Sequence, residues 1–115
     1  MHKQLDIYWV DLEPTRGYET QKKRPCIILQ SDLINKGTKT FIVSPILPNY
    51  KNWPFVVNVK PSKINDLGQE KHINLKQLRV VDISRIEKKQ GILEKHYLAE
   101  IKEKLQLIFG INDYL

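Results

Sequence analysis

The segment DIYWVDLEPTRG, residues 6–17, predicts a buried strand that ends in a turn. Residues 7–10 are apolar on both faces of an extended chain, as expected for a strand inside a tightly curved sheet. The strand should end near residue 13, because Pro14 cannot continue a central strand and Gly17 tolerates the dihedral angles of a turn. The first element of the fold is therefore expected to be a strand.

Short apolar segments separated by turn residues continue this pattern through the first two-thirds of the chain. A second buried strand is expected over residues 25–29, with Pro25 at the first position, where no ladder N–H is needed. A single helical turn is expected over residues 31–35, before Gly37. Further strands are expected over residues 40–47 and 54–59, and one or two more over residues 73–75 and 78–82.

The C-terminal part of the chain has a different hydrophobic period. Its apolar side chains recur mostly at spacings of three and four, at Leu93, Tyr97, Leu98, Ile101, Leu105, Ile108 and Phe109. This spacing predicts an amphipathic helix with one face on the core. Glu100 and Lys104 would support its exposed face, and Gly110 is placed to end it. Antiparallel strands followed by one helix predict a mainly β fold class, a small barrel with a covering α-helix.

The composition limits the classes of protein that the chain can represent. Its 115 residues suit one compact domain, residues 1–115, and 41% hydrophobic and 28% charged residues are ordinary for a soluble protein. Nineteen Lys and Arg against 13 Asp and Glu give a net charge of +6. A basic domain attracts polyanions, so nucleic acid or an acidic protein is an expected partner, although such charge can also serve solubility alone.

Metal, secretion and membrane insertion are not expected from the sequence. The single cysteine, Cys26, cannot form an intrachain disulfide, and it falls in a buried strand pattern typical of inert packing. His2, His72 and His96 lack the spacing of metal ligands, so we expect no metal and no cofactor. No apolar segment approaches the roughly 20 residues of a membrane span, and no secretory signal precedes the first strand, which predicts a cytoplasmic protein.

Two loops carry candidate binding residues. Residues 16–24 gather four basic side chains, a carboxylate, a hydroxyl and Tyr18 between two buried strands; the cations could neutralise phosphates and the ring could stack on a base. A solvated charged loop is the alternative. In residues 49–55, aromatic rings beside Lys51 suit single-stranded nucleic acid. We expect Trp53 at the surface, because polar and proline neighbours flank it, and Phe55 in the core.

Taken together, these segments resemble the MazF/PemK/Kid family of toxin endoribonucleases, in order along nearly the whole chain. Residues 6–17 resemble the family's opening GDIYWVDLxPTxGSE, and residues 21–29, QKKRPCIIL, resemble its QxxRPxxxL strand. The PFVV of residues 54–57 resembles a PFEV-like strand. Residues 77–82, QLRVVD, resemble QIRTID, with Arg85 in the place of a following basic residue.

The resemblance implies a small SH3-like β-barrel, the MazF/CcdB-like toxin fold, with a C-terminal helix. It implies a homodimeric mRNA interferase that cuts single-stranded RNA without metal by attack of the ribose 2′-OH, leaving 2′,3′-cyclic phosphate and 5′-OH ends. It also implies an acidic MazE-like antitoxin as partner, DNA only indirectly through the antitoxin complex, and no membrane.

The resemblance also assigns site residues. Arg24 matches the family's catalytic arginine; its very high pKa makes it a poor proton donor, so its expected role is charge stabilisation. Glu19 matches the loop glutamate, which could orient Arg24 or act as a base; an exposed loop carboxylate is the alternative. Gln77 matches a substrate-contacting glutamine, for which a hydrogen bond to backbone is the alternative. The expected RNA-binding residues are Tyr18, Thr20, Lys22, Lys23, Tyr50, Trp53, Lys76 and Gln77.

The sequence departs from the family at several site positions. Leu47 stands where many members have a threonine beside the arginine, and leucine cannot form a hydrogen bond through its side chain. Thr20, Ser44 or Tyr50 could supply a hydroxyl instead. Positions that carry an acid–base set in the Kid-like branch hold Tyr18, Asn74 and Lys76 here. Two alternatives therefore stay open: a weakened or inactive module that binds RNA or antitoxin, and a CcdB-like toxin acting on a protein target.

Overall fold

The computed structural model describes residues 1–111, which form seven strands, two α-helices and three short 3₁₀ turns. The strands are β1 (Asp6–Asp11), β2 (Lys23–Ile28), β3 (Thr40–Pro48), β4 (Val56–Val59), β5 (Lys71–Asn74), β6 (Arg79–Asp82) and β7 (Ile86–Ile92). The helices are α1 (Asp32–Asn35) and α2 (Leu98–Phe109), and the 3₁₀ turns are η1 (Leu75–Gln77), η2 (Ile83–Arg85) and η3 (Lys95–Tyr97).

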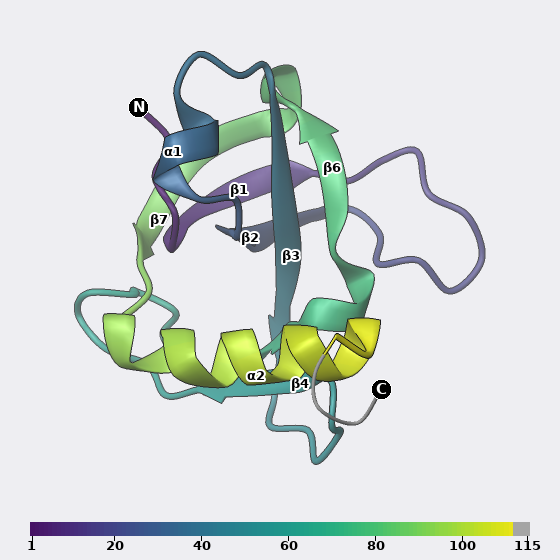
Figure 1. The fold of residues 1–115 in the computed structure, drawn as a ribbon, viewed down its shortest axis with the longest axis vertical. Coiled ribbons are helices and arrows are strands. Elements are labelled where there is room, and N and C mark those ends of the chain that lie inside the picture. Colours follow the sequence, from purple (N-terminus) through teal and green to yellow (C-terminus); the bar gives the residue numbers. More distant parts are fainter. Residues whose placement is uncertain (112–115) are drawn as a thin grey trace.

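All strand pairs are antiparallel, in the order β4-β5-β3-β2-β1-β7, and β6 also pairs with β3. The long strand β3 organises the sheet, since β6 pairs with its residues 40–43 and β5 with its residues 46–48, while β2 pairs with residues 43–45. The sheet curls around the core and α2 lies across it (Figure 1). The expected fold class, a small β-barrel with a C-terminal helix, is confirmed.

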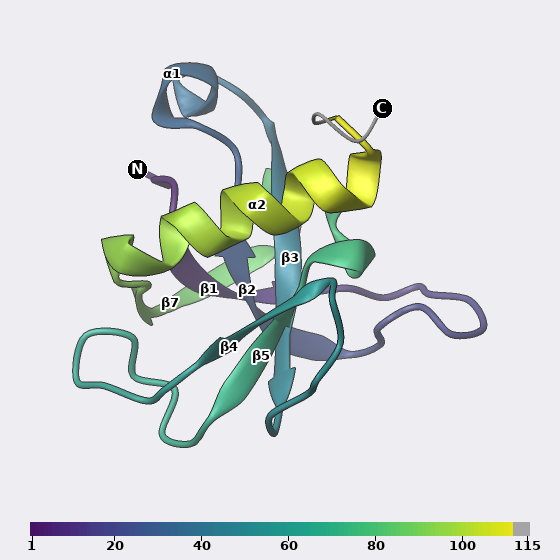
Figure 2. The same ribbon diagram turned by 60° about the horizontal axis from the view of Figure 1, so that its bottom comes forward.

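Two apolar clusters lie on opposite faces of β1 and β2, which explains why residues 7–10 are apolar in both directions. Ile7 and Ile27 belong to the cluster beneath α2 and β4, whereas Val10 and Cys26 belong to a second cluster with β3 and β6. Figure 2 shows α2 crossing the strands in front of β3 and above β4 and β5. The predicted strand and its double-sided burial are therefore confirmed.

The terminal helix ends where the sequence predicts it. Gly110 adopts the left-handed conformation with φ 65°, and its N–H caps the last turn. Glu100 and Lys104 form an ion pair at 3.0 Å, and Lys104 also donates to the Val56 carbonyl at 2.7 Å, which ties α2 to β4. The exposed fraction of Phe109 is 59%, so not every apolar position of the helical pattern reaches the core.

Three element predictions need correction. β2 begins at Lys23, so Pro25 lies inside the strand, opposite Trp9, rather than at its first position. β7 was not predicted, because charged residues interrupt its apolar pattern. A Cβ on Gly91 of β7 would lie 2.6 Å from the Ile64 carbonyl oxygen, so the neighbouring loop packs closely against this strand. Leu93 and Tyr97 precede α2 rather than belonging to it.

No helix within residues 1–111 combines the length and apolar character that crossing a membrane requires.

Candidate active site

A polar cavity of about 410 Å³ lies between the β1–β2 loop, residues 12–22, and the segment that joins η1 to β6. It is lined by Leu12, Pro14, Glu19, Thr20, Pro45, Lys76, Gln77, Leu78 and Arg79. Four of the predicted site residues, Glu19, Thr20, Lys76 and Gln77, therefore share one cavity although up to 58 positions separate them in the sequence. The fold therefore gathers these four candidate site residues around one cavity.

The base of the β1–β2 loop is held by charged side chains. Glu13 accepts a hydrogen bond from the Lys22 N–H at 2.7 Å, and this bond is the main reason that the pKa of Glu13 lies below its usual value. Arg79 donates to the Leu12 carbonyl at 2.9 Å, and Arg85 donates to the Glu13 carbonyl. The loop projects from the barrel (Figure 1), but its base is anchored on β6 and η2.

The tip of the loop is held by Gln77. Its side-chain oxygen accepts from the Thr20 N–H at 3.3 Å, and its side-chain nitrogen donates to the Tyr18 carbonyl at 3.4 Å. Glu19 accepts from the Arg16 N–H at 2.7 Å, and Tyr18 is fully exposed. A hydrogen bond to backbone was the alternative role expected for Gln77, and the structure shows two such bonds.

Arg24 lies on β2 and is not among the residues that line the cavity. It is half-buried, and its Nε–H donates to the Gln21 carbonyl at 3.2 Å. Among the described residues, no ion pair joins it to Glu19, whose hydrogen bond is to the loop backbone. The structure therefore does not bring Glu19 and Arg24 together as an orienting pair.

Two further predicted cations, Lys22 at the end of the loop and Lys23 at the start of β2, lie outside the cavity lining. Lys23 forms an ion pair with Glu87 of β7 at 3.0 Å, and hydrogen bonding and charge attraction from that carboxylate raise the pKa of Lys23. Lys22 has a positive φ of 70° and an exposed side chain. Neither residue lines the cavity, so any RNA contact they make lies outside it.

Leu47 is half-buried on β3, opposite His72 of β5. The His72 Nδ1 lies 2.7 Å from the Asn49 carbonyl, and its Nε2 is buried without a hydrogen-bond partner in the described structure. Ser44 is fully buried opposite Ile27. Because Ser44 and Leu47 are three residues apart on one strand, they face opposite sides of the sheet. Ser44 therefore cannot replace the hydroxyl that Leu47 lacks.

An aromatic pair, one ring exposed and the other half-buried, adjoins the cavity through Lys76. Trp53 stacks on Phe55 with ring centroids 5.5 Å apart, and Lys51 Nζ lies 5.2 Å from the Trp53 ring centre. Trp53 is 43% exposed, as predicted, but Phe55 is half-buried and lies outside both apolar clusters, so its predicted core position is wrong. Lys76 Nζ lies 4.6 Å from the Phe55 ring centre, and this residue joins the aromatic pair to the cavity. Tyr50, in the same loop, is exposed.

Sequence reasoning assigned no role to Arg79, which lines the cavity. Alternation along the strand offered a signal. Val81 is buried, and Arg79, two residues earlier on the same strand, projects from the same face. Within residues 1–111, no group of three His, Cys, Asp or Glu side chains is placed to hold a metal ion.

The fold and the cavity define a small antiparallel β-barrel with a cation-lined site beneath its first loop. Residues 3–109 match the family described as PemK-like, MazF-like toxin of type II toxin-antitoxin system. The chain is 31% identical over 116 residues to the Endoribonuclease MazF of Staphylococcus epidermidis, covering 99% of this chain and 96% of that protein. The chain therefore belongs to the PemK-like, MazF-like toxins of type II toxin–antitoxin systems.

Solved structures share the fold. MazF (Form-I) from Deinococcus radiodurans superposes with a TM-score of 0.80 at 24% identity, covering 95% of this chain and 96% of that chain. An endoribonuclease from a mycobacterial species in complex with its cognate antitoxin gives a TM-score of 0.80 at 15% identity, covering 97% and 98%. The backbone arrangement is thus retained where most side chains differ.

Proposed function

We propose that this toxin is a metal-independent endoribonuclease that cleaves single-stranded RNA, including mRNA. The observation that carries the proposal is the cavity beneath the β1–β2 loop, where Glu19, Thr20, Lys76 and Gln77 converge. The Staphylococcus epidermidis relative is named as an endoribonuclease, and the match covers almost the whole length of both chains. A carboxylate, a hydroxyl and cations in one cavity are the groups that metal-free phosphodiester cleavage requires.

The proposed reaction is attack by the ribose 2′-OH on the adjacent phosphorus. The bond to the 5′-oxygen breaks, and the products are a 2′,3′-cyclic phosphate and a 5′-OH end. In this proposal Glu19 accepts the 2′-OH proton and Arg24 stabilises charge on the phosphoryl oxygens, because a guanidinium can donate two parallel hydrogen bonds. The departing 5′-oxygen takes its proton from water, which gives the 5′-OH end. Since Arg24 is on β2 and outside the cavity lining, the scissile phosphate would sit between Arg24 and the cavity.

A second candidate function is an RNA-binding or antitoxin-binding module that does not cleave. Leu47 favours it, because a leucine side chain supplies no hydroxyl and Ser44 faces the opposite side of the sheet. Of the three hydroxyl residues Thr20, Ser44 and Tyr50, Thr20 is the one that lines the cavity. The match to MazF-like toxins favours the nuclease over a CcdB-like toxin that acts on a protein target.

We further propose that the RNA crosses from the cavity to the aromatic pair, and that an acidic antitoxin competes for this surface. Lys76 is the residue shared by both parts. The predicted contacts Tyr18, Lys22 and Tyr50 are exposed and would border this path. One mycobacterial structural relative is solved in complex with its cognate antitoxin, which supports an antitoxin partner for this chain.

A homodimer is also proposed, on the basis of an apolar groove of about 500 Å³ beside α2. Leu29 and Leu105 line it, together with Leu98 and Phe109, which are 39% and 59% exposed. Contiguous exposed apolar side chains are typical of protein contacts. Sedimentation of wild type beside Phe109→Glu tests this proposal: the variant should be monomeric, and an unchanged dimer or a monomeric wild type would contradict the proposed interface.

The experiment that tests the nuclease uses long single-stranded RNA in EDTA. Wild type, Arg24→Ala and the control Lys88→Ala, which removes an exposed cation of β7, are freed of antitoxin and incubated with the RNA. Cleavage by wild type and Lys88→Ala alone, with 2′,3′-cyclic phosphate ends, would support the proposal. If folded wild type leaves RNAs of wide sequence content intact but binds them, the chain is a binding module.

A further inference from the structure

Arg79 is a half-buried cation without a carboxylate partner among the described residues. It lines the cavity, and none of the ion pairs within residues 1–111 includes it. One of its N–H groups donates to the Leu12 carbonyl at 2.9 Å. A guanidinium carries five N–H donors, so most of its hydrogen-bonding capacity remains for another acceptor.

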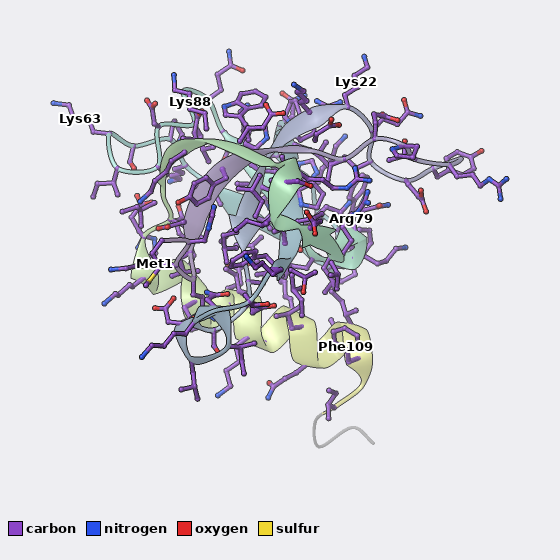
Figure 3. The ribbon with its side chains drawn as sticks, turned by 90° about the horizontal axis from the view of Figure 1, so that it is seen from above. Met1, Lys22, Lys63, Arg79, Lys88 and Phe109 are labelled. Carbon is purple, nitrogen blue, oxygen red and sulfur yellow. The ribbon has the colours of Figure 1, made fainter. Side chains whose placement is uncertain are left out.

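The fold directs Arg79 toward the barrel interior. In the β3–β6 ladder it is opposite Val43, which is fully buried, and the next residue on its face is the buried Val81. Burial raises the pKa of the Cys26 thiol to about 12, and the positive charge of Arg79 acts against that rise, which agrees with a guanidinium close to this cluster. Figure 3 shows Arg79 on the side from which the β1–β2 loop projects.

The lining of the cavity has an excess of positive charge. Lys76 and Arg79 are its two cations and Glu19 is its carboxylate, whose side chain already accepts from the Arg16 N–H. A partly buried charge is costly unless an opposite charge pairs with it. The cavity is therefore suited to an anion, and the planar guanidinium suits the oxygens of a phosphate in particular.

We propose that Arg79, assisted by Lys76, binds one phosphodiester phosphate of the RNA at the floor of this cavity. The inference rests on the proposed function and adds to it a phosphate site separate from Arg24. Arg24 is outside the cavity lining and uses its Nε–H on the Gln21 carbonyl. The two arginines would then hold two different phosphates, which fixes the path of the strand across the site.

The test measures binding of a single-stranded 2′-O-methyl RNA, which cannot be cleaved because the attacking hydroxyl is blocked. Wild type, Arg79→Gln, Arg79→Lys and the control Lys88→Gln are compared over a salt series. Losing one phosphate contact should lower affinity about tenfold and reduce the slope of log affinity against log salt by about 0.7 for Arg79→Gln. Arg79→Lys should retain the slope, and Lys88→Gln should match wild type.

A second arm replaces one phosphate at a time by a neutral methylphosphonate. Wild type should lose affinity at one linkage where Arg79→Gln loses none, because the contact is already absent. An unchanged slope together with the wild-type methylphosphonate profile in Arg79→Gln would overturn the proposal and leave Arg79 as a support for the Leu12 carbonyl. If Arg79→Gln does not fold, the side-chain N–H resonance of Arg79 in wild type decides: it should shift on titration with inorganic phosphate, and no shift would overturn the proposal.

Cleavage of unmodified RNA by wild type is scored separately. Binding that depends on Arg79 without cleavage would reject the nuclease and retain the phosphate site. Cleavage together with binding that does not depend on Arg79 would support the nuclease and reject the phosphate site. Absence of any RNA binding would overturn both.

Discussion

Leu47 of β3 and His72 of β5 are directly opposed in the antiparallel ladder that joins these strands. Opposed residues project from the same face with Cβ atoms about 5 Å apart, so the imidazole is the immediate neighbour of Leu47. Arg24 lies at the same end of the β2–β3 ladder, two residues beyond the Cys26–Pro45 pair, as Leu47 does. Position 47 therefore falls between a guanidinium and a buried imidazole, where a hydroxyl would have charged and polar neighbours.

Leu47→Thr should increase the rate of RNA cleavage. The new hydroxyl would stand on the face that carries Arg24 and could donate to a phosphoryl oxygen, and a gain of about tenfold in the single-turnover rate is expected from one such contact. Leu47→Val is the matched control, since it has the branched shape without the hydroxyl. Equal rates for the two variants would show that the missing hydroxyl does not limit the rate of cleavage.

Gln77→Ala should loosen the tip of the β1–β2 loop without unfolding the barrel. It removes the acceptor of the Thr20 N–H and the donor to the Tyr18 carbonyl. Hydrogen exchange at the Thr20 amide should accelerate about fivefold, corresponding to roughly 1 kcal/mol for one hydrogen bond. The Leu12 amide, which donates to the Lys22 carbonyl, serves as the internal control. Equal acceleration at both amides would indicate general destabilisation instead.

Much of the barrel follows from the sequence, but the cavity does not. β1 and α2 are predicted by hydrophobic period because burial on both faces, or on one helical stripe, leaves a clear pattern. The hydrophobic period does not predict β7, because its charged middle residues face solvent and interrupt the apolar pattern.

The site depends on contacts between segments that are distant in the sequence. Phe55 is apolar yet packs at the surface on Trp53 and beneath Lys76. Arg79 enters the cavity only because β6 pairs with β3 and the first loop folds over its end. Residue types predict a basic site, whereas these long-range pairings determine which cations line it.

Gly91→Ala should destabilise the protein strongly. The added methyl group would lie 2.6 Å from the carbonyl oxygens of Ile64 and Asn65, which are backbone atoms that cannot rotate away. Overpacking of this kind costs about 3 kcal/mol, measurable by urea unfolding. Gly37→Ala is the control, because its Cβ would meet nothing within 4 Å and only its positive φ of 76° opposes the change, at about 1 kcal/mol. Equal losses for both variants would mean that the loop shifts to accommodate the added methyl group.

The buried thiol of Cys26 should make stability fall at alkaline pH. Burial raises its pKa from 9.0 to about 12, so the folded protein keeps a proton that the unfolded chain loses above pH 9. Because the unfolded state then binds fewer protons, the free energy of unfolding must decrease as pH rises, by at most about 1.4 kcal/mol per pH unit from this group. Urea unfolding between pH 8 and about 10.5 should show this extra slope in wild type and not in Cys26→Ala, whose other titrating groups are the same.

The same burial predicts that an aromatic disulfide reagent modifies the thiol at pH 8 only after unfolding. Parallel pH profiles for the two proteins, or rapid modification of the folded chain, would show that solvent reaches Cys26 through the second apolar cluster.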